Sequence, residues 1–204
     1  MTAPKGPVAV ALSGVVDSAA AAALLKRQGC EVLAVHLRLA DGPPSPSLEA
    51  LAGALEIPLL VLDLREEFQA RVVRYFVAEY GRGRTPNPCV MCNAAIKFGV
   101  LLDRLQARGI AHLATGHYVR LGRDKAGRAA LYRGADRSKD QSYFVHRLPR
   151  GLLSHLLFPL GDLTKAQVRA GFRDLGLEPL ENCRESQEIC FIEAEGYREF
   201  LRPR

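Results

Sequence analysis

Apolar runs alternate with helical patterns from residue 8 to residue 115, and this alternation most constrains the fold of the chain. The strand candidates are residues 8–12, 32–39, 59–62 and 110–115, and the helix candidates between them are residues 19–28, 48–55, 68–80 and 94–108. Buried parallel strands form continuous apolar runs and are joined by crossover helices. The sequence therefore predicts an α/β fold, a parallel sheet with helices on both faces.

The pattern changes after residue 117. Residues 118–121 and 129–133 flank a polar, glycine-containing segment and predict a β-hairpin. Thr164 and Gln167 have the spacing of a capping box, which predicts a helix running to residue 175 and ending at Gly176. We therefore expect two domains, residues 1–117 and a small hairpin and helical extension of residues 118–204.

The charge of the chain favours a polyanionic partner. The net charge is +6, and basic residues gather in glycine-punctuated segments. These residues are Arg82, Arg84, Lys97, Arg120, Arg123, Lys125, Arg128, Arg133, Arg137 and Lys139. A solvated surface is the alternative, and we favour nucleic-acid contact over it.

No apolar run reaches the length that spans a bilayer, and the first residues lack the apolar core of a signal peptide. We therefore expect a cytoplasmic protein without membrane contact. The chain has five cysteines, and in a reducing compartment an odd number favours reactive or ligating thiols over a disulfide framework. Cys30 and Cys183 are the weaker candidates, because Cys30 at a helix-to-strand junction is typical of a buried inert thiol.

The segment Ser13-Gly14-Val15-Val16-Asp17-Ser18 follows the first strand and leads into the first helix. Such a turn directs backbone N–H groups and the helix dipole at one point, where a pyrophosphate can bind. Asp17 would repel phosphate unless Mg²⁺ lies between them. The segment is not a Walker loop, because it lacks the Gly-Lys-Ser/Thr ending. An ordinary strand-to-helix turn is the alternative.

Two further segments carry cysteines that favour chemistry. Cys89-Val90-Met91-Cys92 is a C-x-x-C motif, which indicates half a zinc site or a redox pair. Cys92 precedes the helix expected from residue 94, and the dipole of that helix is expected to lower its pKa. Cys190 lies in an apolar segment, where a buried structural thiol is the alternative.

These segments resemble, in the same order, those of the tRNA-specific 2-thiouridylases, which have the PP-loop ATP-pyrophosphatase fold, an adenine-nucleotide alpha-hydrolase-like fold. The resemblance rests on residues 13–18, 83–93, 96–98, 114–118, 139–144 and 186–192. It covers nearly the whole chain. It implies a tRNA-uridine 2-sulfurtransferase that thiolates the wobble uridine.

The resemblance also implies which residues bind the nucleotide and tRNA. ATP, with Mg²⁺, would bind to the loop, to one residue beside the adenine and to one residue on the opposite wall of the site. The wobble uridine would then attack the α-phosphate of ATP. These ATP-binding residues are Ala11, Leu12, Ser13, Gly14, Val15, Val16, Asp17, Ser18, Leu37 and Gly116. The residues implied to contact tRNA are Asn87, Pro88, Cys89, Lys139, Asp140 and Gln141.

The implied sulfur chemistry needs two cysteines. Cys190 resembles the residue that receives a persulfide from a cysteine desulfurase or a sulfur-relay protein, and Cys92 resembles its resolving partner. With Asp17 they form the implied catalytic set. Persulfide transfer, a disulfide and a shared cluster each require Cys92 and Cys190 to lie close together. Cys89, Cys92 and Cys190 could instead hold a [4Fe–4S] cluster, and the cysteine at position 89 favours it.

The sequence departs from the family pattern at two places. Family loops read Ser-Gly-Gly-Val-Asp-Ser, and Val15 stands where the second glycine is usual. A glycine at such a site lets the backbone approach phosphate or adopt a positive φ, so a β-branched residue is expected to clash or to force a different loop path. Family members also continue into two further, mostly β, domains, whereas this sequence ends at Arg204. A degenerate relative that binds tRNA or carries sulfur without ATP is therefore the alternative function.

Overall fold

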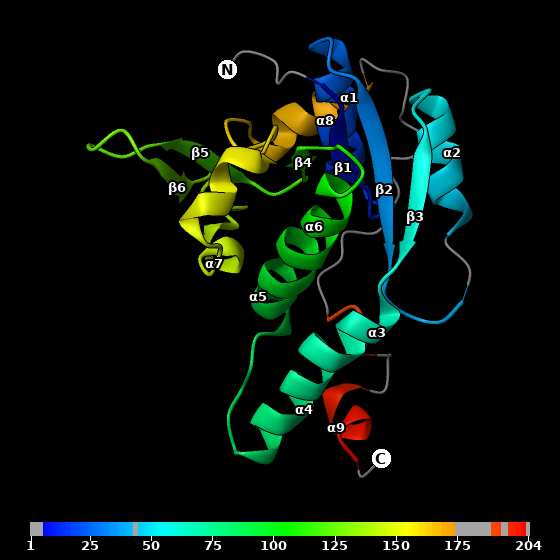
Figure 1. The fold of residues 1–204 in the computed structure, drawn as a ribbon, viewed down its shortest axis with the longest axis vertical. Coiled ribbons are helices and arrows are strands. Elements are labelled where there is room, and N and C mark those ends of the chain that lie inside the picture. Colours follow the sequence, from blue (N-terminus) through cyan, green and yellow to red (C-terminus); the bar gives the residue numbers. More distant parts are fainter. Residues whose placement is uncertain (1–5, 43–44, 174–188, 193–195, 203–204) are drawn as a thin grey trace.

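The structure is a computed structural model that describes residues 6–42, 45–173, 189–192 and 196–202. Its centre is a five-stranded parallel sheet in the order β3-β2-β1-β4-β7 (Figure 1). The strands are β1 (Val8–Ala11), β2 (Val32–Arg38), β3 (Leu59–Asp63), β4 (His112–Ala114) and β7 (Leu156–Leu157). The parallel α/β prediction is confirmed. The two-residue strand β7 was not predicted, because it is too short to give a sequence pattern.

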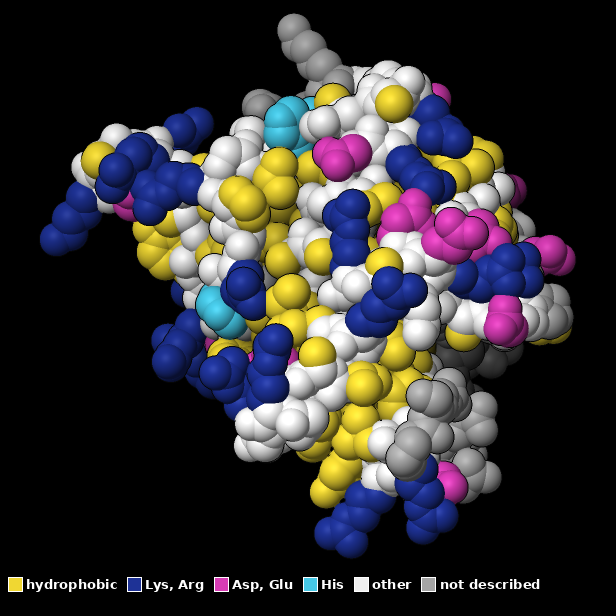
Figure 2. Space-filling view, turned by 60° about the horizontal axis from the view of Figure 1, so that its bottom comes forward, with side chains coloured by type: hydrophobic (Ala, Val, Ile, Leu, Met, Phe, Trp, Pro, Cys, Tyr) yellow, Lys and Arg dark blue, Asp and Glu magenta, His cyan; other side chains and the backbone are white. Residues whose placement is uncertain are grey.

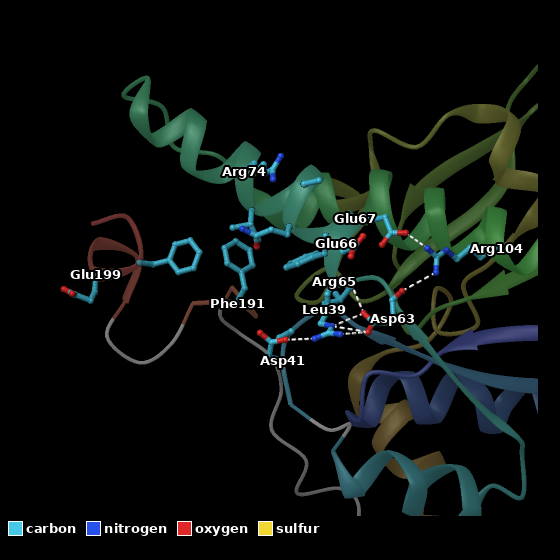
Figure 3. A pocket seen from close by; sticks show the side chains of 16 residues that line it. Leu39, Asp41, Asp63, Arg65, Glu66, Glu67, Arg74, Arg104, Phe191 and Glu199 are labelled. Atoms are coloured by element: carbon cyan, nitrogen blue, oxygen red, sulfur yellow. Dashed lines mark hydrogen bonds and ion pairs between the residues drawn. The ribbon is translucent and has the colours of Figure 1, made fainter. Parts of the chain in front are cut away.

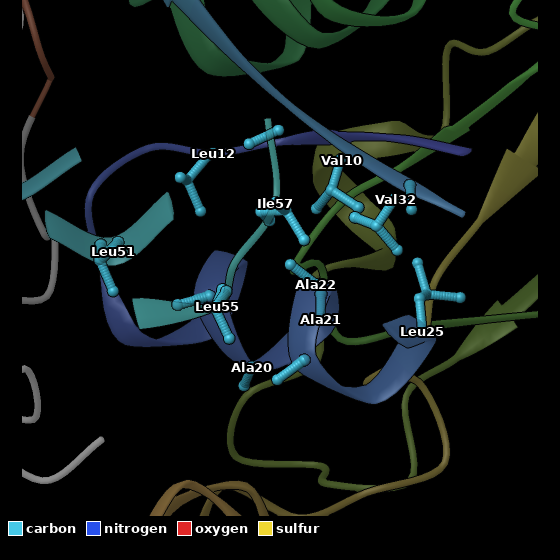
Figure 4. Packing of buried hydrophobic residues seen from close by; sticks show 14 of the residues in the cluster. Val10, Leu12, Ala20, Ala21, Ala22, Leu25, Val32, Leu51, Leu55 and Ile57 are labelled. Carbon is cyan, nitrogen blue, oxygen red and sulfur yellow. The ribbon is translucent and has the colours of Figure 1, made fainter. Parts of the chain in front are cut away.

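Helices cover both faces of the sheet, as expected for buried parallel strands. Val8 and Val10 of β1 pack into one core with α1 (Val16–Arg27), α2 (Pro46–Ala54) and α8 (Lys165–Arg173). Figure 4 shows Val10 and Val32 facing the alanines of α1 in this core. Ala9 between them packs into the other core, and this alternation explains why the whole strand is apolar.

The opposite face is covered by two longer helical segments. The first comprises α3 (Arg65–Phe68), the π-helical turn η1 (Gln69–Val73) and α4 (Arg74–Gly81). The second comprises α5 (Pro88–Cys92), the π-helical segment η2 (Asn93–Val100) and α6 (Leu101–Gln106). Their apolar residues, among them Phe68, Val72, Leu101 and Leu105, form the second core.

The second of these segments begins six residues before the expected start at residue 94. Asn87 is the N-cap, and its side-chain oxygen accepts hydrogen bonds from the N–H groups of Cys89 (3.1 Å) and Val90 (3.3 Å). Pro88 occupies the first helical position, where its fixed φ suits the helix and its missing N–H costs nothing. The Asn-Pro pair was an overlooked start signal, and it places Cys92 inside the helix.

The residues after 117 form the predicted hairpin and several short helices. Strands β5 (Val119–Arg123) and β6 (Ala129–Arg133) pair antiparallel, and the hairpin extends from the body of the molecule (Figure 1). The helices are α7 (Ser142–Val145), the 3-10 turn η3 (Arg150–His155), α8 and α9 (Gly196–Phe200). The proposed boundary between residues 117 and 118 stays a prediction, while β7 and α8 join the sheet and its core.

The predicted capping box at the start of α8 is confirmed. The Thr164 N–H donates to Gln167 Oε1 (2.8 Å), and the Gln167 N–H donates to Thr164 Oγ1 (3.2 Å). The predicted end of this helix, residues 174–176, lies outside the described residues. None of the helices in the described ranges is long and apolar enough to cross a membrane.

Candidate active site

A cleft of about 670 Å³ opens at the carboxyl ends of β1, β2 and β4. The chain passes from β1 to β2 and β3 on one side and then returns to place β4 on the other side. In open parallel sheets, ligands bind where the strand order reverses in this way. Most predicted site residues line the cleft, namely Ala11, Leu12, Ser13, Val15, Val16, Asp17, Ser18, Leu37, Pro88, Cys89, Cys92, Gly116, Lys139, Gln141 and Cys190. Gly14, Asn87 and Asp140 are not among its lining residues.

The loop between β1 and α1 is closed by its two serines. Ser18 Oγ accepts hydrogen bonds from the N–H and the hydroxyl of Ser13, both at 3.1 Å, and donates to the Val15 carbonyl oxygen at 3.0 Å. Gly14 has a φ of +81°, a conformation that favours glycine. Val15 has a φ of −111° and a ψ of 159°, which any residue adopts. The positive φ of this loop falls one residue earlier, at Gly14, so Val15 carries no backbone strain. A clash between the Val15 side chain and a bound phosphate stays a prediction.

The first turn of α1 is open to a ligand. None of the described side chains caps this helix, whose N-cap is Val15, so its first N–H groups are available to an anion. Gly116 forms the facing wall, and a Cβ there would lie 2.7 Å from the carbonyl carbon of Asp17. Because glycine has no Cβ, the backbone at Gly116 can pack directly against the backbone of Asp17 and Ser18.

Asp17 is held by two residues from distant parts of the chain. Its Oδ1 atom accepts a hydrogen bond from the Tyr118 hydroxyl (2.8 Å) and forms an ion pair with Lys165 Nζ (2.7 Å). Neither residue was predicted to belong to the site. The segment containing Tyr118 contributed to the resemblance, but no signal connects Lys165, which lies 148 positions after Asp17, to the loop.

Cys89 and Cys92 lie one turn apart on α5, where Cys92 is buried. Burial raises the pKa of the Cys92 thiol to about 11. The expected lowering by a helix N-terminus is therefore wrong. Cys92 is the fifth residue of its helix, and the effect of the dipole falls off within the first turn. Desolvation then dominates, because it disfavours the thiolate.

Cys190 lines the same cleft, but unlike Cys92 it is exposed to solvent. Partial desolvation of its thiol raises its pKa, and the nearby Cys89 thiol adds to the effect. Cys190 in turn contributes to the raised pKa of Cys92, so the two thiols are electrostatic neighbours. Lys97 lowers the pKa of each of the three thiols, but less than burial raises it.

A cluster held by Cys89, Cys92 and Cys190 stays a prediction. Among the described residues, which include Cys89, Cys92 and Cys190, no group of three His, Cys, Asp or Glu side chains is placed to hold a metal ion. All four described cysteines are free thiols, and Cys30 is a buried thiol within the core. Cys183 and residues 186–188 of the last motif lie outside the described residues.

His117 is the other perturbed group of the cleft. Desolvation, with a smaller effect of Lys97, lowers its pKa to about 3, so the imidazole is neutral. The Asn93 side-chain amide donates to the Phe144 carbonyl (3.0 Å) and to His117 Nε2 (3.4 Å). This leaves the proton on Nδ1, which donates to Thr115 Oγ1 at 2.8 Å. Asn93 Oδ1 is buried without a hydrogen-bond partner among the described residues.

Several residues implied to contact tRNA also hold local structure. Asn87 caps α5. Asp140 accepts hydrogen bonds from the Gly134 N–H (2.9 Å) and the Ser142 hydroxyl (2.8 Å), and Gln141 Oε1 accepts from the Tyr118 N–H (3.0 Å). Gln141 therefore supports the residue that holds Asp17. Lys139 and Gln141 line the cleft.

A second, larger hollow of about 1270 Å³ adjoins the cleft and shares five lining residues with it, namely Leu39, Ala40, Asp41, Phe68 and Phe191. Figure 3 shows Arg65 between Asp41 and Asp63, and Arg104 against Glu67. The guanidinium nitrogens of Arg65 lie 2.6 Å from Asp41 Oδ1 and 2.8 Å from Asp63 Oδ2. Both arginines are thus paired with carboxylates. The loop and the thiols lie at the smaller cleft, which we therefore take as the candidate site.

Known proteins are similar to this chain in sequence. The family profile described as the tRNA methyl transferase HUP domain matches residues 6–194. The tRNA-specific 2-thiouridylase MnmA of Moorella thermoacetica is 47% identical over 96% of this chain and 58% of its own length. That of Thiobacillus denitrificans is 47% identical over 95% of this chain and 57% of its own length. The chain thus spans less than two thirds of the length of these relatives.

Solved structures share the fold at low identity. The NMN synthetase of Francisella tularensis has a TM-score of 0.55 and 18% identity, covering 89% of this chain and 66% of its own. The NH3-dependent NAD synthetase of Campylobacter jejuni has a TM-score of 0.52 and 18% identity, covering 86% of this chain and 66% of its own. At this identity the likeness concerns the fold alone.

Proposed function

The chain belongs to the tRNA methyl transferase HUP domain family, and from this premise we propose that it is an ATP-dependent tRNA sulfurtransferase. It forms 2-thiouridine at the wobble position through an adenylated base and cysteine-bound sulfur. One observation carries the proposal. The loop at the start of α1 and the thiols of Cys92 and Cys190 line the same cleft.

The cleft has the features that a nucleoside triphosphate needs. The uncapped first turn of α1 offers N–H groups to phosphate, Ser13 adds an exposed hydroxyl, and Gly116 permits close approach of the backbone. Asp17 is the carboxylate that would hold Mg²⁺, which is commonly bound by one or two carboxylates together with substrate phosphates. Bound Mg²⁺ would offset the repulsion between this carboxylate and the phosphates.

The first chemical step activates the base. The C2 oxygen of the wobble uridine attacks the α-phosphorus of ATP, a P–O bond forms, and pyrophosphate leaves. Adenylation turns the C2 oxygen from a poor leaving group into a good one, because in the next step this oxygen departs as part of AMP. The chain contributes the positions of the two reactants, since the loop holds the phosphates and the thiols lie beside them.

The second step transfers sulfur. A persulfide on Cys190 attacks C2 with its terminal sulfur, a C–S bond forms, and AMP leaves. The Cys92 thiol then attacks the Cys190 sulfur, the bond between Cys190 and the transferred sulfur breaks, and a disulfide forms. The departing 2-thiouridine takes up the proton that Cys92 loses. Exposed Cys190 suits a thiol that receives sulfur from another protein, a cysteine desulfurase or sulfur-relay protein, while buried Cys92 suits a resolving thiol.

The substrate tRNA has a basic surface available. Figure 2 shows lysine and arginine side chains gathered on the projecting β5–β6 hairpin. The exposed residues there are Arg120, Arg123, Lys125, Arg128 and Arg133. Such a surface contacts phosphates without reading sequence, so recognition of the uridine falls to the cleft.

The test is nucleoside analysis of tRNA by mass spectrometry, in cells with and without the gene. We expect 2-thiouridine to fall on deletion and to return when the gene is restored. Incubation of the purified chain with ATP, a persulfide donor and unmodified tRNA should form the same nucleoside and release AMP. Unchanged 2-thiouridine in the deletion strain would refute the proposed function.

A further inference from the structure

We propose that Lys165 is a phosphate-binding residue of the nucleotide cleft, with its ammonium group held over the loop by Asp17. This inference rests on the proposed use of a nucleoside triphosphate. It adds to the nucleotide site a phosphate-binding side chain that lies far from the loop in the sequence. Lys165 is the first residue of α8, so it joins the extension after residue 117 to the loop after β1.

Both the backbone and the side chain of Lys165 are held by interactions with other residues. Its backbone N–H donates to Asp136 Oδ2 at 3.0 Å, and its Nζ lies 2.7 Å from Asp17 Oδ1. Lys165 is only 8% exposed, yet it lines the cleft together with Ser13 and Ser18. A lysine held in this way loses little conformational freedom on binding a ligand, which favours affinity.

The charges of the loop require a cation at this point. Asp17 stands in the first turn of α1, where the open N–H groups would otherwise receive an anion. An unpaired carboxylate there would oppose a phosphate at short range. Lys165 neutralises Asp17, and an ammonium group with three donors can bind the carboxylate and a phosphate oxygen together. The Asp17–Lys165 pair then converts a repulsive site into one that accepts phosphate.

The alternative is a pair that only joins α8 to the loop. The Lys26–Glu56 pair shows what such a pair looks like, since it joins α1 to the end of α2 at 3.0 Å. Its side chains are 42% and 83% exposed, and neither residue lines the cleft. Lys26 is therefore the matched control, a paired lysine remote from the site.

The experiment measures binding of inorganic pyrophosphate and of ATP by calorimetry, with EDTA present so that Mg²⁺ does not contribute. The variants are Lys165→Met, Asp17→Asn, the double variant, and Lys26→Met. Thermal unfolding of each variant checks that it is folded. Because Asn cannot pair with an ammonium group as a carboxylate does, the Asp17→Asn background removes the ion pair between Lys165 and Asp17. Any effect of Lys165→Met in that background therefore does not arise from the loss of this pair.

We expect Lys165→Met to weaken pyrophosphate binding by about 10- to 100-fold, the loss typical of a charge-assisted hydrogen bond. Asp17→Asn should tighten it, and Lys165→Met should weaken it again in the Asp17→Asn background. Equal affinities of Asp17→Asn and the double variant, in folded proteins, would overturn the inference while leaving ATP use intact. Wild-type protein that binds neither ligand would overturn both ATP use and the inference. Weaker binding by the double variant than by Asp17→Asn, with Lys26→Met like the wild type, would support the inference even if no tRNA were thiolated.

Discussion

Gly116 lies against the backbone of Asp17 so closely that a Cβ at Gly116 would stand 2.7 Å from the Asp17 carbonyl carbon and 2.8 Å from the Ser18 nitrogen. These are backbone atoms of the loop, which cannot turn aside as the end of a side chain can. We predict that Gly116→Ala shifts the loop, weakens ATP binding at least tenfold, and destabilises the fold by about 1–3 kcal/mol, the usual cost of overpacking. Calorimetry and urea unfolding measure the two effects.

The matched control is Gly53→Ala. Gly53 lies in helix α2, and a Cβ there meets nothing within 4 Å among the described atoms. Alanine forms helices better than glycine, so this variant should keep its ATP affinity and gain up to about 1 kcal/mol of stability. If Gly116→Ala behaves like Gly53→Ala, the proposed wall of the cleft is wrong.

A second prediction concerns Val15, where the family has glycine. Val15 already adopts an extended conformation, so Val15→Gly gains no backbone freedom that the loop needs. We expect unchanged or weaker ATP binding and a stability loss of up to about 1 kcal/mol from added chain entropy. Gly14→Ala should instead impair binding, because Gly14 has a φ of +81°. Tighter ATP binding by Val15→Gly, seen by calorimetry, would restore the clash hypothesis.

The fold was largely predictable because β1, β2, β3 and β4 lie in mostly apolar runs near turn residues. Val8, Ala9 and Val10 of β1 alternate between the two cores. This alternation explains why every residue of the run is apolar, instead of every second residue. Strand β7 was not predictable, since Leu156 and Leu157 become a strand only by pairing with β4. Short pairings of this kind come from tertiary structure and not from local pattern.

The site was predictable where residues are local to a motif and not where the fold brings them together. The loop and the cysteine segments were recognised from consecutive residues, and most of their members line one cleft. Lys165 reaches Asp17 only because α8 packs on α1. The pKa of Cys92 was predicted in the wrong direction, because burial depends on neighbours that the sequence does not reveal.

The third prediction separates the roles of the cysteines. Cys92→Ala and Cys190→Ala should each abolish 2-thiouridine formation, because one removes the resolving thiol and the other the sulfur carrier. Cys89→Ala should keep activity, since the described thiols are not arranged as a three-ligand metal site. The control is Cys30→Ala, a core thiol that does not line the cleft. Nucleoside analysis of tRNA from cells carrying each variant decides the matter, and an inactive, folded Cys89→Ala would count against this assignment.

The fourth prediction is a pH dependence of stability that originates at His117. Its pKa is lowered from the ordinary 6.5 to about 3, so between these values the unfolded chain binds the proton and the folded chain does not. The free energy of unfolding is therefore highest above pH 6.5 and falls as the pH drops toward 3. From this residue alone we expect a loss of about 2 kcal/mol between pH 7 and pH 5.

Urea unfolding at several pH values should show this loss in wild-type protein and a smaller one in His117→Gln. Exposed His146 provides the control, since His146→Gln should keep the wild-type loss; equal losses in all three proteins would show that His117 is not the group responsible.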